Sequence, residues 1–276
     1  MGQSLMAWNN RLYLAWRGVH TDDEDDPSLW WTSFDGNQWD TVQHFGSRSQ
    51  AAPFLIAHRD KLHMYWRGEL DLAGNEDKRV YHAAFDGTRW EQGAILGGRN
   101  VTETNIYVTN AFASRIYMAA RDANGDNILY WSEDGYYWDV NDRYVLPANL
   151  GNLPPRVYGF PGFETSTLML CYVRTGDGQL YARTSDDRGR NWSAEFAVNG
   201  MQNASCPLIA TWGSADPYGV YVRTQDGVGR IYQVRLNPGA TWLDPATGTT
   251  PGPDSPPIPN LPRIGVVAAY GDMLFP

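Results

Sequence analysis

Five arginines recur at one position of a repeated sequence pattern, and they are the first candidates for chemistry. Each arginine ends a short aliphatic and aromatic run, such as YLAWR or CYVR. A guanidinium group donates hydrogen bonds in a planar fork and stacks on aromatic rings, so it suits hydroxyl-rich or carboxylate ligands. An ion pair between each arginine and an acidic residue of the next loop is the structural alternative. The five candidates are Arg17, Arg67, Arg121, Arg174 and Arg223.

Aromatic residues that exceed the needs of packing are the second group of candidates. The chain has 12 Trp and 16 Tyr among its 276 residues. Aromatic rings offer flat apolar faces for stacking, although a strand aromatic is also an ordinary core residue. The surplus residues are Trp16, Trp31, Trp66, Tyr107, Trp131, Tyr158 and Trp212. We assign Trp31, Trp66 and Trp131 to ligand binding together with the arginines.

A repeat of about fifty residues positions these candidates. Five tryptophans lie 51, 48, 54 and 50 residues apart, and most follow a turn of the type SFDGNQW or AFDGTRW. In such a turn Gly supplies a positive φ, the Asp side chain accepts backbone hydrogen bonds, and Trp packs between strands. The pattern therefore predicts structural roles for Asp35, Asp86, Asp134 and Asp187 and for Trp39, Trp90, Trp138, Trp192 and Trp242.

Each repeat contains four short strand patterns and no helical periodicity, which predicts an all-β, five-bladed β-propeller. The expected blades are 3–51, 52–103, 104–155, 156–206 and 207–242. Residues 243–262 hold seven prolines and are expected to form an extended tether. The end of the chain, AYGDMLFP, resembles AWNNRLYL at 7–14. Residues 263–276 therefore predict a hairpin that closes the ring, begins an incomplete sixth blade, or mediates oligomer formation.

The segment SDDRGRNW (185–192) fits the full Asp-box pattern S-x-D-x-G-x-x-W, and the other turns are variants of it. The repeat therefore resembles the sialidase-like propellers and the tachylectin-2-like and tectonin-like propeller lectins. This resemblance implies that the Asp-box turns lie on the face opposite the ligand site. Sialidase chemistry would imply a Phe/Tyr-Arg-Ile-Pro motif near the start, which this chain lacks.

Uniform repetition and surplus aromatics favour a non-enzymatic carbohydrate-binding propeller with several repeated sites and glycans as partners. A glycoside hydrolase is the alternative, with Glu103 and Glu164 as its candidate catalytic carboxylates. A protein-interaction scaffold is the third hypothesis.

Composition excludes several other classes. The net charge of −9 argues against nucleic acid as a partner, and no apolar run is long enough to span a membrane. The acidic loop 22–26 lacks the residue order of a calcium loop, and the five histidines lack metal-ligand spacing, so we expect neither metal nor cofactor. No signal peptide is recognisable, which leaves the cytoplasm or non-classical secretion, and Cys171 and Cys206 are expected to be free thiols.

Overall fold

The structure is a computed structural model, and its regular elements are all β-strands. It describes residues 3–18, 26–69, 77–91, 94–95, 106–110, 115–122, 124–138, 142–146, 155–159, 168–174, 178–202, 208–212, 216–225, 228–236, 242–243, 268–270 and 273–275. Within these residues there is no helix, which confirms the prediction of an all-β chain.

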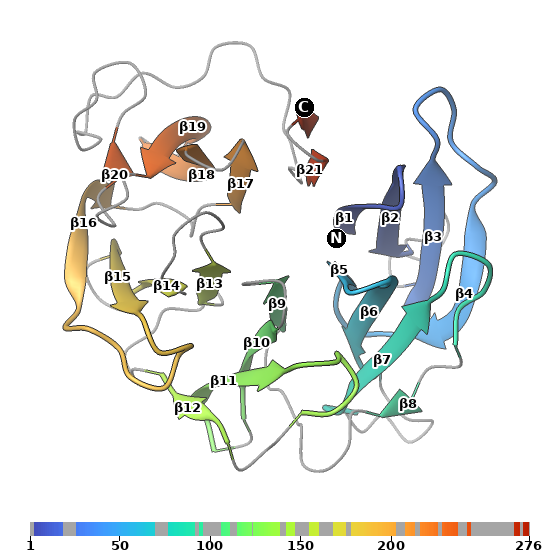
Figure 1. Cartoon of the computed structure of the whole chain (residues 1–276), viewed down its shortest axis with the longest axis horizontal. Helices are drawn as coiled ribbons and strands as arrows, with labels where there is room; N and C mark the ends of the chain where they lie inside the picture. Colours follow the sequence, from blue (N-terminus) through green and yellow to red (C-terminus); the bar gives the residue numbers. More distant parts are fainter. Residues whose placement is uncertain are drawn as a thin grey trace. The chain divides into compact units, whose positions relative to one another are not determined.

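The described strands form five four-stranded antiparallel sheets and one two-stranded sheet (Figure 1). Sheet 1 contains β1 (Gln3–Trp8), β2 (Arg11–Arg17), β3 (Ser28–Phe34) and β4 (Gln43–Arg48). Sheet 2 contains β5 (Phe54–His58), β6 (Lys61–Arg67), β7 (Val80–Phe85) and β8 (Ala94–Ile95). Sheet 3 contains β9 (Tyr107–Asn110), β10 (Ile116–Arg121), β11 (Asn127–Ser132) and β12 (Tyr144–Val145).

The remaining strands follow the same order of antiparallel neighbours. Sheet 4 contains β13 (Arg156–Gly159), β14 (Leu168–Val173), β15 (Gln179–Ser185) and β16 (Phe196–Gln202). Sheet 5 contains β17 (Leu208–Trp212), β18 (Asp216–Gln225), β19 (Val228–Leu236) and β20 (Trp242–Leu243). The last sheet is a hairpin of β21 (Ala268–Tyr270) and β22 (Met273–Phe275).

The chain divides into two compact units, Met1–Leu146 with sheets 1 to 3 and Pro147–Pro276 with the rest. Within the first unit, β1 lies beside β5 and β5 beside β9, so the first strands of the three sheets are neighbours (Figure 1). Within the second unit, β17 contacts both strands of the β21–β22 hairpin. No sheet closes on itself in the described residues, and the number of blades stays a prediction.

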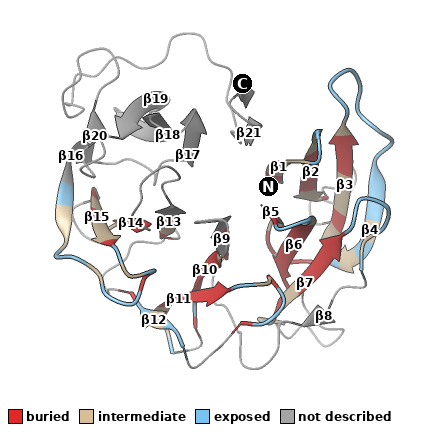
Figure 2. Cartoon of the chain, viewed as in Figure 1, coloured by how far each residue is buried: buried red, intermediate tan, exposed pale blue. Residues whose placement is uncertain are grey.

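One apolar core fills the space between sheets 1 and 2. Leu62, Met64 and Trp66 alternate along β6 and pack with Tyr13 and Leu29 of sheet 1. All five side chains are buried, and the central strands of sheet 2, β6 and β7, are mostly buried (Figure 2). Because β6 is covered on both faces, the residues that alternate with these apolar side chains, His63, Tyr65 and Arg67, are buried as well.

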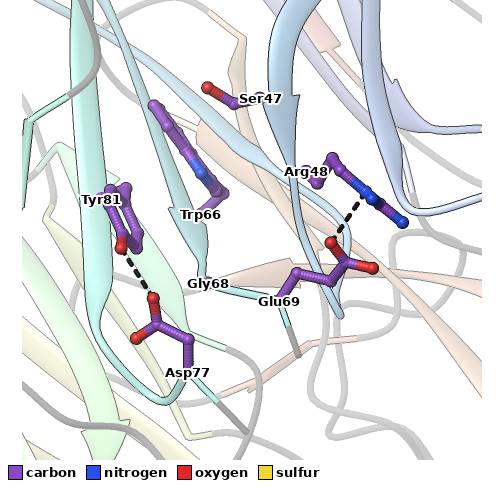
Figure 3. Close-up of a pocket in the computed structure, with 7 residues that line it drawn as sticks. All are labelled: Ser47, Arg48, Trp66, Gly68, Glu69, Asp77 and Tyr81. Carbon is purple, nitrogen blue, oxygen red and sulfur yellow. Dashed lines mark hydrogen bonds and ion pairs between the residues drawn. The ribbon is translucent and has the colours of Figure 1, made fainter. Parts of the chain in front are cut away.

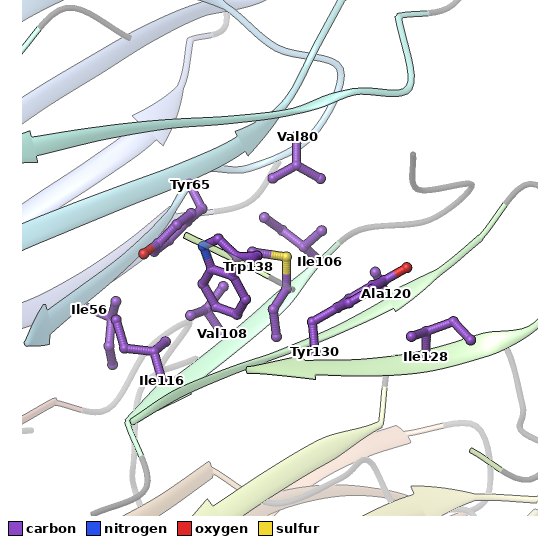
Figure 4. Packing of buried hydrophobic residues seen from close by; sticks show 11 residues of the cluster. Ile56, Tyr65, Val80, Ile106, Val108, Ile116, Ala120, Ile128, Tyr130 and Trp138 are labelled. Atoms are coloured by element: carbon purple, nitrogen blue, oxygen red, sulfur yellow. The ribbon is translucent and has the colours of Figure 1, made fainter. Parts of the chain in front are cut away.

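A second core joins sheets 2 and 3 (Figure 4). Tyr65 and Val80 of sheet 2 meet Ile116 and Tyr130 of sheet 3, together with Trp138 from the turn after β11. The Tyr65 hydroxyl donates a hydrogen bond to the carbonyl of Gly135, at 2.7 Å, in that turn. Burial of these large side chains holds the two sheets together.

The aspartate turns share a hydrogen-bond pattern. Asp35 Oδ1 accepts from the backbone N–H groups of Asn37 and Gln38, at 2.8 and 2.9 Å. Asp86 and Asp134 likewise accept from the residues two and three positions later, and Asp187 accepts from the N–H of Asn191. These hydrogen bonds explain why each turn contains an aspartate, and they require no catalytic role of the carboxylates.

The turn tryptophans differ in burial, and Trp138 and Trp90 pack against the preceding sheet. Trp138 is 4% exposed and lies edge-on to Tyr65 of sheet 2. Trp90 is half-buried and packs on Phe45 of sheet 1. Trp39 is 48% exposed, because among the described residues of its unit no sheet precedes sheet 1. Trp192 is half-buried, and the side chain of Trp242 lies outside the described part of the chain.

Candidate functional site

A cavity of about 220 Å³ lies between sheets 1 and 2, at the end of β6 where the repeated arginine stands (Figure 3). Its lining residues are Ser47, Arg48, Trp66, Gly68, Glu69, Asp77 and Tyr81. The end of β4 provides the first two residues, and the ends of β6 and β7 with their flanking residues provide the others. Two neighbouring sheets therefore build one cavity.

Two aromatic rings form the apolar part of the cavity. Trp66 and Tyr81 are cross-strand partners on β6 and β7, and their rings stack 5.8 Å apart at 15°. Phe45 of β4 meets Trp66 edge-on, which fixes the indole ring from the other sheet. Trp66 is only 2% exposed, whereas Tyr81 is half-buried and has the Arg79 guanidinium 5.7 Å from its ring centre.

Ion pairs form the polar part of the cavity. Arg48 Nε lies 2.8 Å from Glu69 Oε2, so this pair links sheet 1 to sheet 2. Arg79 Nε and Nη2 donate to the two oxygens of Asp77, each at 2.7 Å. The Tyr81 hydroxyl also donates to Asp77 Oδ2, at 2.6 Å. Each carboxylate is thus matched by a guanidinium group, and the site presents both donors and acceptors.

The side chain of Asp77 is ionised at neutral pH. Hydrogen bonds from Arg79, with a further one from Tyr81, lower the pKa of Asp77 to about 2 against the opposing effect of burial. Its position depends on Gly68, where a Cβ would lie 2.5 Å from the carboxyl carbon of Asp77. Gly68 is also held by a 2.9 Å hydrogen bond from its N–H to the carbonyl of Arg79. Because Gly68 has no side chain, the Asp77 carboxylate can lie against the backbone directly after β6.

The structure does not place the described side chains of the repeated arginines in this cavity. Arg17 Nε donates to the carbonyl of Ser49 at 2.9 Å, and Arg121 Nε donates to the carbonyl of Gly125 at 3.0 Å. The Arg67 side chain is buried. Arg223 lies in β18, where side chains are not described. The assignment of these arginines to ligand binding stays a prediction.

Arg174 belongs to a separate polar cluster in sheet 4. It forms an ion pair with Glu195, and its guanidinium lies 4.0 Å from the centre of the Tyr181 ring. Arg174 Nη1 also donates to the Tyr181 hydroxyl at 3.2 Å. Tyr172 donates its hydroxyl hydrogen to the same glutamate. These contacts stay within sheet 4 and the segment before β16.

The three candidate tryptophans have different environments. Trp66 lines the cavity. Trp31 is half-buried and packs on Tyr13 and Phe85, and Trp131 is buried beneath Arg115, whose guanidinium lies 6.0 Å from the ring centre. Glu103, Glu164 and residues 22–25 lie outside the described residues.

Sequence reasoning missed Arg48, Glu69, Asp77 and Arg79. One signal was present: an aspartate stands four residues before the aromatic residue of the third strand in Asp26-Trp30, Asp77-Tyr81, Asp126-Tyr130 and Asp177-Tyr181. The structure gives this spacing a contact, because Trp30 Nε1 donates to Asp26 Oδ2 and the Tyr81 hydroxyl donates to Asp77. Arg48 and Glu69 carry no such signal, since their ion pair connects two different repeats.

Three further features bear on the expected chemistry. In the described ranges, no three His, Cys, Asp or Glu side chains gather in a way that could hold a metal ion. No helix in the described part of the chain has the length and apolar character of a membrane span. Cys171 is buried and takes part in no disulfide bond among the described residues, whereas Cys206 falls outside them.

Comparison with solved structures identifies the fold. An exo-β-1,3-galactanase from Phanerochaete chrysosporium, solved with β-1,3-galactotriose, has a TM-score of 0.57 at 11% identity over 87% of this chain and 61% of its own. NanB sialidase from Streptococcus pneumoniae gives 0.58 at 11% identity, over 88% and 60% of the two chains. The Aleuria aurantia lectin, in complex with Fucα1-6GlcNAc, gives 0.56 at 16% identity, over 87% and 77%.

This chain spans about three fifths of the length of the galactanase and the sialidase. No protein-family model matches the sequence. No curated protein matches it either. At these low identities the structural likeness shows the fold alone, and that fold is the β-propeller found in sialidases, galactanases and lectins.

Proposed function

We propose that the chain is a carbohydrate-binding propeller and that the cavity between sheets 1 and 2 binds the sugar. The observation that carries this proposal is a half-buried ring, Tyr81, beside the Arg48–Glu69 pair and Asp77 in one cavity. Sugar hydroxyls both donate and accept hydrogen bonds, so they match carboxylate acceptors next to guanidinium donors. The sugar's apolar face would lie on Tyr81.

The same charges favour a neutral sugar. Arg48 is already paired with Glu69, and Arg79 with Asp77, so neither guanidinium is left to neutralise an acidic ligand. A sialic or uronic acid would place its carboxylate near Glu69 and Asp77, and like charges repel at such distances. A neutral glycan avoids that repulsion and keeps both ion pairs.

Binding is favoured over hydrolysis at this site because its best-held carboxylate is poorly suited to acid catalysis. A glycosidase needs one carboxyl group with a raised pKa to protonate the leaving group. Asp77 has a lowered pKa and is fixed by Arg79 and Tyr81. The solved galactanase and sialidase keep a glycoside hydrolase as the second candidate function, to be tested on the same protein.

A glycan array followed by calorimetry tests the proposal. We expect Arg48→Ala and Glu69→Gln each to weaken binding of an array-selected neutral glycan by about 10- to 100-fold, the effect of losing one charge-assisted hydrogen bond. Arg11→Ala is the matched control, because Arg11 pairs with Asp40 in the same sheet but does not line the cavity.

Three results would contradict the proposal. They are an empty array, equal affinity in all three variants, and release of product from chromogenic glycosides by the wild type but not by Glu69→Gln. The last result would favour the hydrolase, and a protein partner captured without any glycan would favour the scaffold.

We also propose that each four-stranded sheet is one of five blades, with bounds close to the ranges given for the repeat, and that the β21–β22 hairpin repeats the first half of a blade. Two observations support this arrangement. The pairing of Tyr270 with Met273 in the hairpin matches the pairing of Trp8 with Arg11 between β1 and β2. In addition, β21 neighbours β17 as β5 neighbours β1.

Deletion of residues 263–276 tests the role of this hairpin. We expect the melting temperature to fall by several degrees, because the strands β21 and β22 and their contacts with β17 would be lost. Size-exclusion chromatography should show an unchanged oligomeric state. A well-folded monomer produced from a dimer would instead mean that the hairpin is exchanged between chains, and an unchanged melting temperature would contradict both roles.

A further inference from the structure

We infer that sugar binding is confined to one specialised site per chain, built by sheets 1 and 2, with Glu69 as its specificity-determining residue. This inference rests on the proposed function and departs from the several equivalent sites that the repeat predicts. Three independent features of the five four-stranded sheets lead to it: the ring pair, the carboxylate after the repeated arginine, and the length of one connection.

At the position directly before the repeated arginine, two of the five four-stranded sheets have a cross-strand pair of aromatic residues. In sheet 2, Trp66 directly precedes the repeated arginine and is the cross-strand partner of Tyr81. The same register position in sheet 1 holds Trp16 and Trp30, which are also two rings. Sheets 3, 4 and 5 have aliphatic pairs there, namely Ala120 with Ile128, Val173 with Leu180, and Val222 with Ile231. A sugar ring has no aromatic face to stack on at those three positions.

The carboxylate that pairs with Arg48 occurs once. Glu69 stands two residues after Arg67. The residues at the same distance after the other repeated arginines are Val19, Ala123, Gly176 and Gln225. Sheet 1 therefore keeps the two rings and an aspartate, Asp26, but has a valine in place of the glutamate. Sheet 4 also combines a stacked ring pair, Tyr172 and Tyr181, with the Arg174–Glu195 ion pair, but these groups belong to one sheet and the segment before β16. Among the described residues, a ring pair beside an ion pair that links two sheets is found only where Glu69 meets Arg48.

The connection between the second and third strands also separates sheet 2 from most of the others. Twelve residues join β6 to β7 and ten join β2 to β3, whereas five, five and two residues make this connection in sheets 3, 4 and 5. In sheet 3 the short connection closes on itself, because Asp122 Oδ1 accepts from the N–H groups of Asn124 and Asp126. Arg121 then donates to Gly125 within the same turn. A tight turn leaves little polar surface for a ligand.

Calorimetry and native mass spectrometry with an array-selected neutral glycan test the inference. We expect one glycan per chain, and we expect Glu69→Gln to remove most of that binding while the melting temperature stays within a few degrees. Gln225→Ala, at the equivalent position of sheet 5, is the matched control and should leave stoichiometry and affinity unchanged.

The outcomes separate this inference from the proposed function. Two or more glycans per chain, reduced by one in Glu69→Gln, would overturn the single-site inference and leave the proposed function standing. One glycan per chain whose affinity is the same in Glu69→Gln would overturn the assignment of Glu69. Absence of any glycan binding would overturn both.

Discussion

The free energy of unfolding falls by about 3–5 kcal/mol between pH 7.5 and pH 4.5, because two buried histidines must stay neutral in the folded chain. His63 Nδ1 and His82 Nε2 lie 2.9 Å apart between β6 and β7, and both side chains are almost fully buried. Burial lowers the pKa of His63 to about 4 and that of His82 to about 3, and the proximity of other histidines adds to both shifts.

The direction of this pH effect follows from the lowered pKa values. In the unfolded chain both histidines become protonated below a pH of about 6.5. In the folded chain His63 becomes protonated only near pH 4 and His82 only near pH 3. The stability that neutral histidines contribute is therefore complete above pH about 6.5 and is lost as the pH falls toward the folded-state values.

Neighbouring groups hold the histidine pair in place. The turn after β11 covers it, since a Cβ on Gly135 would lie 2.5 Å from His63, and the Tyr136 ring meets both imidazoles edge-on. Gly135 has a φ of 83°, so a larger residue there would be strained as well as crowded. The titratable groups that face the pair are His58, Lys61, Tyr65, Glu91, Asp134 and Tyr136.

Chemical denaturation across this pH range measures the effect. The double variant His63→Gln, His82→Gln removes both titrating groups and should show a clearly smaller loss of stability on acidification. His44→Gln is the control for removal of a histidine, because His44 is exposed on β4 and lies outside the buried pair. An identical pH dependence in the wild type and the double variant would contradict the prediction, and NMR titration of the two imidazoles would check it directly.

Replacement of Trp138 by alanine lowers the free energy of unfolding by about 3–5 kcal/mol, the usual cost of removing a buried aromatic ring. Trp138 is 4% exposed and fills the core between sheets 2 and 3, where it packs on Tyr65 (Figure 4). Its indole N–H also donates to the carbonyl of Gly135 at 3.2 Å.

Trp39→Ala is the matched control for this change. Trp39 occupies the same place in its own turn but is 48% exposed, so the substitution should cost about 1 kcal/mol or less. Urea denaturation of both variants gives the comparison. Equal costs would mean that an additional part of the molecule covers Trp39, and a small cost for Trp138 would contradict the described core.

The sequence predicted the strands well because their signals are local. Each repeated arginine ends or directly follows the second strand of a four-stranded sheet or lies within it, and the apolar segments around it form the strands expected. The pairing register of the second and third strands was harder to predict from the sequence. Leu29-Trp30 and Val80-Tyr81 occupy equivalent positions, but Tyr130 pairs with Met118, two residues away from the position that corresponds to Tyr81.

The site was harder to predict because it depends on contacts between repeats. Arg48 and Glu69 are 21 positions apart in the sequence and belong to different sheets, so neither has a pattern that marks the other. The repeat pattern marks the residues that recur in every repeat, whereas the cavity is lined largely by residues that do not recur. The burial of Trp66 and the exposure of Trp39 likewise depend on which sheet lies next to each ring.

A crystal structure with an array-selected neutral glycan bound shows directly where the sugar lies. We expect one sugar ring in the cavity between sheets 1 and 2, with its face on Tyr81 and its hydroxyl groups within hydrogen-bond distance of Arg48, Glu69 or Asp77. We also expect crystals of Glu69→Gln to show no sugar there. A glycan seated elsewhere on the chain, with this cavity empty, would contradict the proposed site.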